Sequence, residues 1–234
     1  MKYIKLFSAA AVAAFLLAAC VSSPKVAPQP SSITKADVDS ASYALGVYLA
    51  QMIQMNGLGD LNMSKIVKGC NDYLKYGDEK FDVNFVNERM SSFLTKKREA
   101  AANENKKKGE DFLAKNAKAE GVVTTESGLQ YKILHNGNGD FPTSARDTVT
   151  AHYTLTSVDG EVIESSRDMG EPITFPLTNV IQGWIEGMQL IDEGGQIMLY
   201  IPSDLAYGEN GPNGPNETLV FDIELIEVKH ASED

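Results

Sequence analysis

The sequence predicts an α+β protein: an all-α N-terminal region with a long helix, followed by an antiparallel β-sheet wrapped on a short helix. Two observations predict this architecture. Apolar residues recur at helical intervals up to about residue 120, and from about residue 121 they alternate with polar residues, as in strands with one buried face. The chain has 234 residues, which is enough for one or two domains.

The first 19 residues have the layout of a secretory signal peptide, which is removed from the mature protein. A basic start is followed by an apolar run, and small residues lead directly into Cys20. The run is shorter than the ~20 residues that cross a bilayer as a helix. The stretch resembles a bacterial lipobox, which implies a mature chain that begins at a lipidated Cys20. Residues 20–36 are rich in Ser and Pro and suit a flexible tether.

Two helices are predicted within residues 37–81. The first covers 37–55 and carries apolar residues at intervals of three and four. Thr34 and Asp37, which precede or begin it, match the pattern of a capping box. The second helix is shorter and covers 62–75.

Cys70 lies on the second predicted helix, four positions after Ile66 and four before Leu74. Its place in this apolar stripe predicts a small buried side chain. Because the resemblance to a lipobox assigns Cys20 to the lipid, Cys70 is the only remaining thiol, and we expect no intramolecular disulfide.

A third helix is predicted from residue 82 to residue 118. This stretch has no proline and is rich in Ala, Lys and Glu, which favour helix. As one helix it would be about 55 Å long at ~1.5 Å per residue. A polar helix of this kind usually bridges solvent or tethers a domain, and the alternative is a charged disordered linker. We therefore expect residues 82–120 to form a long connecting helix.

Strand-like alternation follows, and residues 121–234 are predicted to be one α+β domain. The expected strands lie within 128–137, 147–157, 172–177, 195–202 and 217–228. The pair Asp159-Gly160 follows the second of them and indicates a hairpin turn. One short helix, at about residues 179–190, interrupts the strands.

The charge is uneven, and few residues suggest other chemistry. Residues 20–120 carry a net charge of +2 and residues 121–234 a net charge of −15. The acidic half argues against nucleic-acid binding, which needs a basic surface. No H-x-x-H or C-x-x-C spacing suggests a metal. Ser165 and Ser166 suit a turn, and the glycine-rich segment 208–217 suits a mobile surface loop.

The only tryptophan of the chain lies in the run NVIQGWIEGM. This run, with SGLQYKILHNGNG, VTAHYTLTSVDGEVIESSRD and TLVFDIELIEV, resembles the FKBP-type peptidyl-prolyl isomerases over residues 121–229. The helical region is similar to that of the macrophage infectivity potentiator subgroup, in the runs SYALGVYLAQ and NKKKGEDFL. The resemblance implies an FKBP-like fold and prolyl isomerase activity without a cofactor.

The resemblance also implies a dry aromatic pocket that binds X–Pro segments. Trp184 would form its floor, and the N–H of Ile181 and the hydroxyl of Tyr207 would hold substrate carbonyls. The implied catalytic residues are Tyr153, Glu164, Ile181, Trp184, Tyr207 and Phe221. The implied substrate-binding residues are Ile163, Ile173, Phe175 and Val180.

Three departures from the family pattern lie in this pocket. The family usually has Phe-Asp where this chain has Ile163-Glu164, and an aromatic residue where it has Ile173. The loop 208–217 is shorter than the common form and lacks the apolar residues that press on a bound proline. These departures imply a wider, slower pocket with only weak macrolide binding.

The subgroup consists of exported dimers whose N-terminal helices intertwine and whose long helix carries each isomerase domain. The resemblance therefore implies a homodimer through residues 37–81, a lipid anchor to the outer membrane at Cys20, and proline-containing unfolded or nascent exported proteins as partners. Lys25, and no acidic residue, follows Cys20 closely, which favours the periplasmic face. The alternative hypothesis is a holdase chaperone that grips unfolded chains between two arms, with weak or no isomerase activity.

Overall fold

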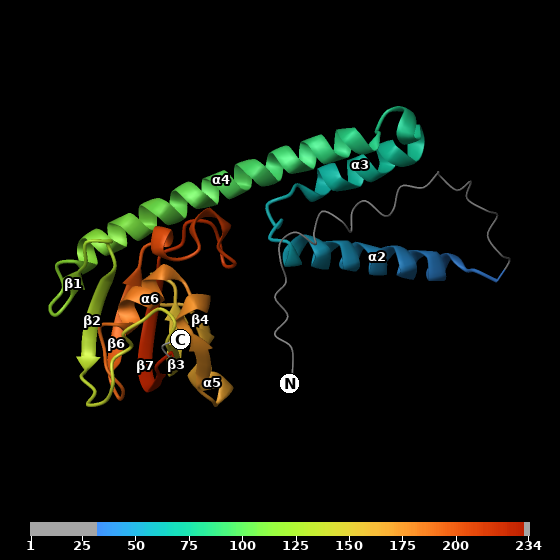
Figure 1. Ribbon diagram of the computed structural model, residues 1–234. Coiled ribbons are helices and arrows are strands. Elements are labelled where there is room, and N and C mark those ends of the chain that lie inside the picture. Colours follow the sequence, from blue (N-terminus) through green and yellow to red (C-terminus); the bar gives the residue numbers. More distant parts are fainter. Residues whose placement is uncertain (1–31, 232–234) are drawn as a thin grey trace. The chain divides into compact units, whose positions relative to one another are not determined.

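The structure is a computed structural model that describes residues 32–231 (Figure 1). The predicted signal peptide and the predicted lipidation site Cys20 lie outside the described residues. The chain divides into two compact units, Met1–Phe93 and Leu94–Asp234. None of the helices within residues 32–231 is long and apolar enough to cross a membrane.

The N-terminal unit contains α2 (Lys35–Met55), α3 (Met63–Tyr76) and the first part of α4 (Val83–Asn116). The predicted capping box is confirmed. The Thr34 hydroxyl accepts a hydrogen bond from the Asp37 N–H at 3.2 Å, and the Thr34 N–H donates to the Asp37 carboxylate at 2.8 Å. All three predicted helices are present, and α4 is one continuous helix of 34 residues.

The apolar faces of α2 and α3 are uncovered in a single chain, because neither helix contains a buried residue. Cys70 is exposed, so the prediction of a buried thiol is wrong. Cys70 lies on an apolar stripe as predicted, but Leu74 of that stripe is exposed as well and only Ile66 is partly buried. On α2, Tyr43 is 77% exposed and Leu45 is 68% exposed. Contiguous apolar exposure of this kind marks an interaction surface.

The C-terminal unit is built on an antiparallel sheet with the strand order β1-β2-β6-β7-β3-β4, in which β5 also pairs with β3. Its strands are β1 (Val123–Thr124), β2 (Gln130–His135), β3 (Thr148–Thr156), β4 (Val162–Ser165), β5 (Ile173–Pro176), β6 (Gln196–Ile201) and β7 (Leu219–Lys229). The strands expected from the sequence do not include β1 or β4, and the short helix α5 (Ser166–Met169) was not predicted. The predicted hairpin turn is confirmed, because Gly160 has a φ of +84° and its N–H donates to the Ser157 carbonyl at 3.0 Å.

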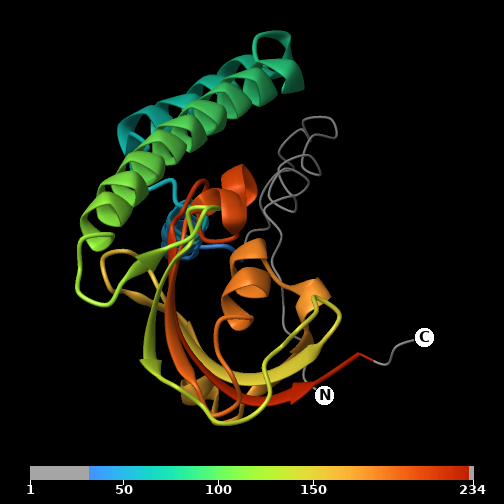
Figure 2. The ribbon, with the colours of Figure 1, turned by 60° about the vertical axis from the view of Figure 1, so that its left-hand side comes forward.

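The sheet curves around the helix α6 (Gln182–Met188), which lies in its concave face (Figure 2). The two longest strands, β3 and β7, alternate buried and less buried residues, as their sequences predicted. The core between sheet and helix is apolar. Its largest fully buried side chains include Leu129, Leu177, Met188, Ile191, Ile197, Leu199, Ile201, Ile223 and Leu225.

Two glycines allow α6 to approach the sheet closely. A Cβ added to Gly183 would lie 2.4 Å from Cγ2 of Ile201, and one added to Gly187 would lie 2.4 Å from Cδ1 of Leu199. Both distances are shorter than any tolerable carbon–carbon contact. The glycine that precedes the tryptophan therefore sets the depth at which Trp184 enters the core.

Candidate functional site

A cavity of about 660 Å³ opens between the concave face of the sheet, the beginning of α6 and the segment that follows the 3₁₀ turn Ser203–Leu205. Its lining is mostly apolar and aromatic, with a few polar groups, which is the usual composition of a ligand pocket. The residues that line it are Tyr153, Leu155, Glu164, Ile173, Phe175, Asn179, Val180, Ile181, Gln182, Trp184, Ala206, Tyr207 and Phe221.

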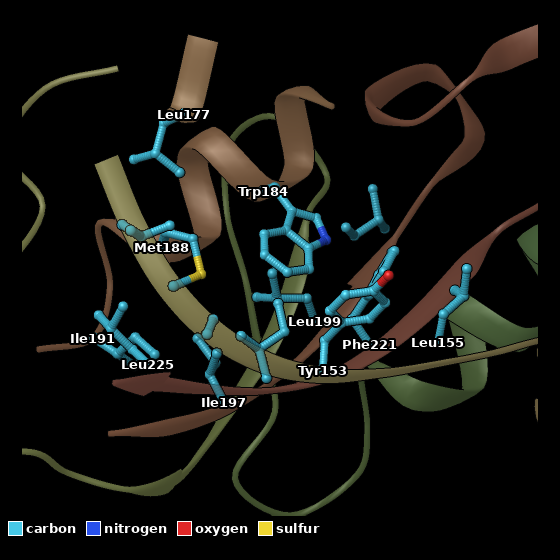
Figure 3. Packing of buried hydrophobic residues seen from close by; sticks show 14 of the residues in the cluster. Tyr153, Leu155, Leu177, Trp184, Met188, Ile191, Ile197, Leu199, Phe221 and Leu225 are labelled. Atoms are coloured by element: carbon cyan, nitrogen blue, oxygen red, sulfur yellow. The ribbon is translucent and has the colours of Figure 1, made fainter. Parts of the chain in front are cut away.

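Trp184 forms the centre of an aromatic cluster at the base of this cavity (Figure 3). Its ring meets the rings of Tyr153, Phe175 and Phe221 edge to face, at centroid distances of 5.7, 5.2 and 5.2 Å. Only 4% of Trp184 is exposed. Packing on three sides holds the indole in one orientation, so the base of the cavity is rigid.

The strand register brings the other lining residues to the same place. Leu155 of β3 pairs with Glu164 of β4 on one side and with Phe221 of β7 on the other. Tyr153 lies two residues earlier on β3 and therefore faces the same side of the sheet. The antiparallel ladders thus place residues from 153 to 221 around one cavity.

A hydrogen bond joins two of the polar lining groups. The Tyr153 hydroxyl donates to Oε1 of Glu164 at 2.7 Å, so the longer glutamate side chain does reach the tyrosine. The pKa of Tyr153 is raised, mainly by burial and to a smaller extent by this hydrogen bond. Burial, and then the charge of Glu164, also raise the pKa of Tyr207. Both phenols are therefore neutral hydrogen-bond donors near neutral pH.

Three donors in the cavity have no protein partner among residues 32–231: the backbone N–H of Ile181, the hydroxyl of Tyr207 and the indole N–H of Trp184. Ile181 is the N-cap of α6, where the backbone N–H groups of a helix have no intrahelical acceptor. Tyr207 is about half exposed, at 49%. The cavity can therefore offer hydrogen bonds to the carbonyl groups of a bound peptide.

Ser166 supports the site from behind, and the sequence did not indicate this role. The serine is fully buried. Its hydroxyl accepts from the Tyr153 N–H at 2.8 Å and donates to the Tyr153 carbonyl at 3.2 Å. His152 does not line the cavity, and its Nδ1 lies 3.1 Å from the same hydroxyl. Ser166 begins α5 directly after β4, and its burial is visible only in the structure.

The structure gathers nine of the ten pocket residues predicted from the sequence. The tenth, Ile163, packs against the core cluster and does not line the cavity, because it alternates with Glu164 along β4. No residue of the loop 208–217 lines the cavity. The lining residues that the sequence reasoning missed are Leu155, Asn179, Gln182 and Ala206. All but Leu155 adjoin a predicted residue in the chain, and Leu155 follows Tyr153 at the strand period.

No group of three or more His, Cys, Asp or Glu side chains that could hold a metal ion is found in the described part of the chain. Glu164 is the acidic residue among those that line the cavity, and its Oε1 accepts the hydrogen bond of Tyr153. The arrangement suits binding and desolvation of a neutral, partly apolar ligand.

Two family models match the chain. Residues 140–226 match the FKBP-type peptidyl-prolyl cis-trans isomerase model, and residues 38–133 match the domain amino-terminal to FKBP-type peptidyl-prolyl isomerase. An FKBP-type peptidyl-prolyl cis-trans isomerase FkpA of Aeromonas hydrophila is 41% identical over 90% of this chain and 83% of its own length. The outer membrane protein MIP of Legionella longbeachae is 39% identical over 94% and 98%.

Two solved structures of similar proteins share the fold of this chain. The crystal structure of FkpA from Escherichia coli matches 84% of this chain and 99% of its own chain, with a TM-score of 0.65 and 35% identity. A crystal structure of a peptidyl-prolyl cis-trans isomerase from Pseudomonas syringae matches 55% of this chain and 96% of its own, with a TM-score of 0.51 and 32% identity. The helical region followed by an antiparallel sheet on a short helix, as predicted from the sequence, is confirmed.

Proposed function

Because the chain belongs to the FKBP-type peptidyl-prolyl cis-trans isomerases, we propose that the cavity above Trp184 is its isomerase site and that its substrates are X–Pro segments of unfolded or nascent exported proteins. The observation that carries the proposal is an aromatic base combined with hydrogen-bond donors that no described protein group uses. A proline ring would rest on the indole of Trp184. The N–H of Ile181 and the hydroxyl of Tyr207 would hold the carbonyls on either side.

The chemistry requires no bond to the protein. Rotation about a peptide bond has a barrier of ~18–20 kcal/mol, and X–Pro isomerisation is slow enough to limit folding. The planar amide is more polar than the twisted one, so water stabilises the ground state more than the transition state. A dry pocket removes that preference, which lowers the barrier. An acceleration of about 10⁵-fold would need roughly 7 kcal/mol.

The Tyr207 hydroxyl gives a direct test of the site. Tyr207→Phe removes one free donor and little volume, so the free energy of unfolding should hardly change. If the hydroxyl holds a substrate carbonyl, its loss removes about 0.5–1.5 kcal/mol of stabilisation. We therefore expect kcat/KM to fall roughly three- to tenfold in a protease-coupled assay on a proline tetrapeptide.

The matched control is Tyr200→Phe, which removes a tyrosine hydroxyl from β6 that does not line the cavity. It should leave the rate unchanged. An unchanged rate in Tyr207→Phe would remove this residue from the site. If the unaltered protein has only background activity but suppresses aggregation of an unfolded client, the holdase alternative replaces the isomerase proposal.

We also propose that the protein is a homodimer joined through its N-terminal helices. The helix α2 carries exposed apolar side chains around much of its surface, and a helix that is apolar on all sides is normally buried. Its exposed apolar residues include Val38, Tyr43, Leu45, Val47, Tyr48, Leu49 and Met55. A second copy of the same helix offers a complementary apolar surface by symmetry.

The location is proposed from the sequence and one relative. One of the similar proteins is named an outer membrane protein, and the signal-like start of this chain leads into Cys20. We propose that lipidated Cys20 anchors the protein at the periplasmic face of the outer membrane. Cys20→Ser should release a soluble or unprocessed form of the protein from the detergent-dependent membrane fraction. If the Cys20→Ser variant remains in the membrane fraction, the proposed lipid anchor is wrong.

A further inference from the structure

The part of α4 that belongs to the C-terminal unit, residues 94–116, contacts the sheet domain along one face. Residues of this segment that contact the sheet domain include Arg98, Asn105, Gly109, Phe112 and Asn116. Their spacing of seven, four, three and four places them on one stripe of a helix. We call this stripe the docked face of α4. Near the end of the helix it is held by Phe112, whose ring lies 6.0 Å from that of Tyr200.

On the N-terminal side of Phe112, the docked face binds the loop 208–217. The Arg98 guanidinium donates to the Glu209 carbonyl at 2.6 Å and to the Asn210 side-chain oxygen at 2.7 Å. The Asn105 side-chain amide donates to the Pro215 carbonyl at 2.9 Å. The helix therefore holds the loop close to both of its ends, instead of leaving it as the mobile surface loop expected from the sequence.

A third contact sets how close the helix lies. Gly109 is buried in α4, and a Cβ added there would lie 2.2 Å from Oγ1 of Thr218. Thr218 immediately precedes β7. Only a glycine permits this approach of the helix backbone to the end of the loop.

The loop connects two residues that line the cavity. Tyr207 precedes it and Phe221 follows it on β7. Within the loop, the Asn210 N–H donates to the Tyr207 carbonyl at 3.2 Å, and the Asn216 N–H donates to the Gly208 carbonyl at 2.8 Å. The backbone of Tyr207 is thus tied to the segment that Arg98 and Asn105 hold.

The contacts with α4 add to the two backbone hydrogen bonds of the loop, and the composition of the loop makes such support important. The loop contains three glycines, and Gly208 and Asn216 have φ values of +54° and +56°. A segment with many glycines loses much conformational entropy when it is ordered. Few apolar contacts compensate for this loss, because the loop is composed of Gly, Pro, Asn and Glu.

We infer that the docked face of α4 positions the catalytic pocket: Arg98 and Asn105 fix the loop 208–217, and the loop fixes the Tyr207 hydroxyl. The inference rests on the proposed isomerase site. Arg98 and Asn105 are positioning residues, because neither lines the cavity. The connecting helix is then a part of the catalytic unit and not only its tether. A small displacement of a group that holds the substrate can cost up to a hundredfold in rate.

The test uses the full chain with Arg98→Ala and Asn105→Ala combined. We expect kcat/KM on a proline tetrapeptide to fall about three- to tenfold, because two anchors that hold the loop are lost. Amide hydrogen exchange in residues 208–217 should become faster. The matched control combines Lys96→Ala and Asn103→Ala. Lys96 has the same charge as Arg98, Asn103 is an asparagine like Asn105, and both lie at exposed positions of α4. The control should resemble the unaltered protein in both measurements.

A double-mutant cycle separates positioning from general loosening. In a Tyr207→Phe background, the Arg98→Ala/Asn105→Ala pair should cost less than twofold, because the hydroxyl through which it acts is already absent. Equal losses in both backgrounds, or an unchanged rate and unchanged loop exchange in the original background, would overturn the inference. If the unaltered protein shows no isomerase activity, the proposed function fails, and the exchange measurement still decides whether α4 holds the loop.

Discussion

Gly183→Val is expected to destabilise the C-terminal unit by about 1–3 kcal/mol and to remove most of the isomerase activity. The new side chain would begin 2.4 Å from Cγ2 of Ile201 in a core with no space for it. Either α6 moves away from β6 or the isoleucine leaves its rotamer. Both responses displace Trp184, which follows Gly183 directly and forms the base of the cavity.

The measurement is thermal unfolding followed by tryptophan fluorescence, together with the protease-coupled rate. Trp184 is the only tryptophan, so the fluorescence reports on this unit alone. The size-compensating variant is Ile201→Ala, which by itself costs about 2–5 kcal/mol because it leaves a cavity. Combined with Gly183→Val it should cost less than the sum of the two, because each change makes room for the other.

The matched control is Gly69→Ala in α3, where an added Cβ meets nothing within 4 Å. There the substitution should be neutral or should stabilise the helix by about 0.5–1 kcal/mol. A thermal midpoint unchanged by Gly183→Val, or strictly additive losses in the double variant, would show that the close approach of α6 to β6 does not control the pocket.

The second large effect is expected on assembly. Leu45→Lys combined with Leu49→Lys places two charges, one helical turn apart, on the exposed apolar surface of α2. Burying an unpaired ammonium group in an apolar interface is strongly unfavourable. Light scattering on the processed protein should therefore change from the mass of two chains to the mass of one.

Ile226→Lys is the matched control, because Ile226 is an apolar residue of β7 that is 42% exposed and lies outside α2. It should leave the mass of the assembly unchanged. Activity on a tetrapeptide should survive loss of the dimer, since all residues that line the cavity lie between positions 153 and 221 of one chain. A monomeric mass for the unaltered protein, or a dimeric mass for the double lysine variant, would contradict assembly through α2.

Local pattern determined much of this protein. The alternation of apolar residues predicted β2, β3, β5, β6 and β7, intervals of three and four predicted α2 and α3, and a composition that favours helix predicted α4. The capping box at Thr34 was readable for the same reason, because all of its partners lie within three positions. The run around Trp184 carried the family resemblance that implied the pocket, and the structure shows the close packing of its glycine and its aromatic residue.

Other features depended on contacts between residues far apart in the chain. Whether Glu164 reaches Tyr153 depends on the register of β3 and β4 and on side-chain length, which no pattern supplies. Cys70 lies in a correctly identified stripe, yet its exposure depends on what covers that stripe.

The docked face of α4 is the clearest case of a feature that only the tertiary structure decided. Its contacts to the loop use Arg98, Asn105 and Gly109, which are separated from their partners by more than 100 positions. Hydrophobic periodicity detects a buried face only when apolar side chains form it. Here the helix binds the loop through polar side chains and through the absence of a side chain. The sequence alone therefore indicated a solvated tether, whereas the folded chain makes the same helix part of its catalytic unit.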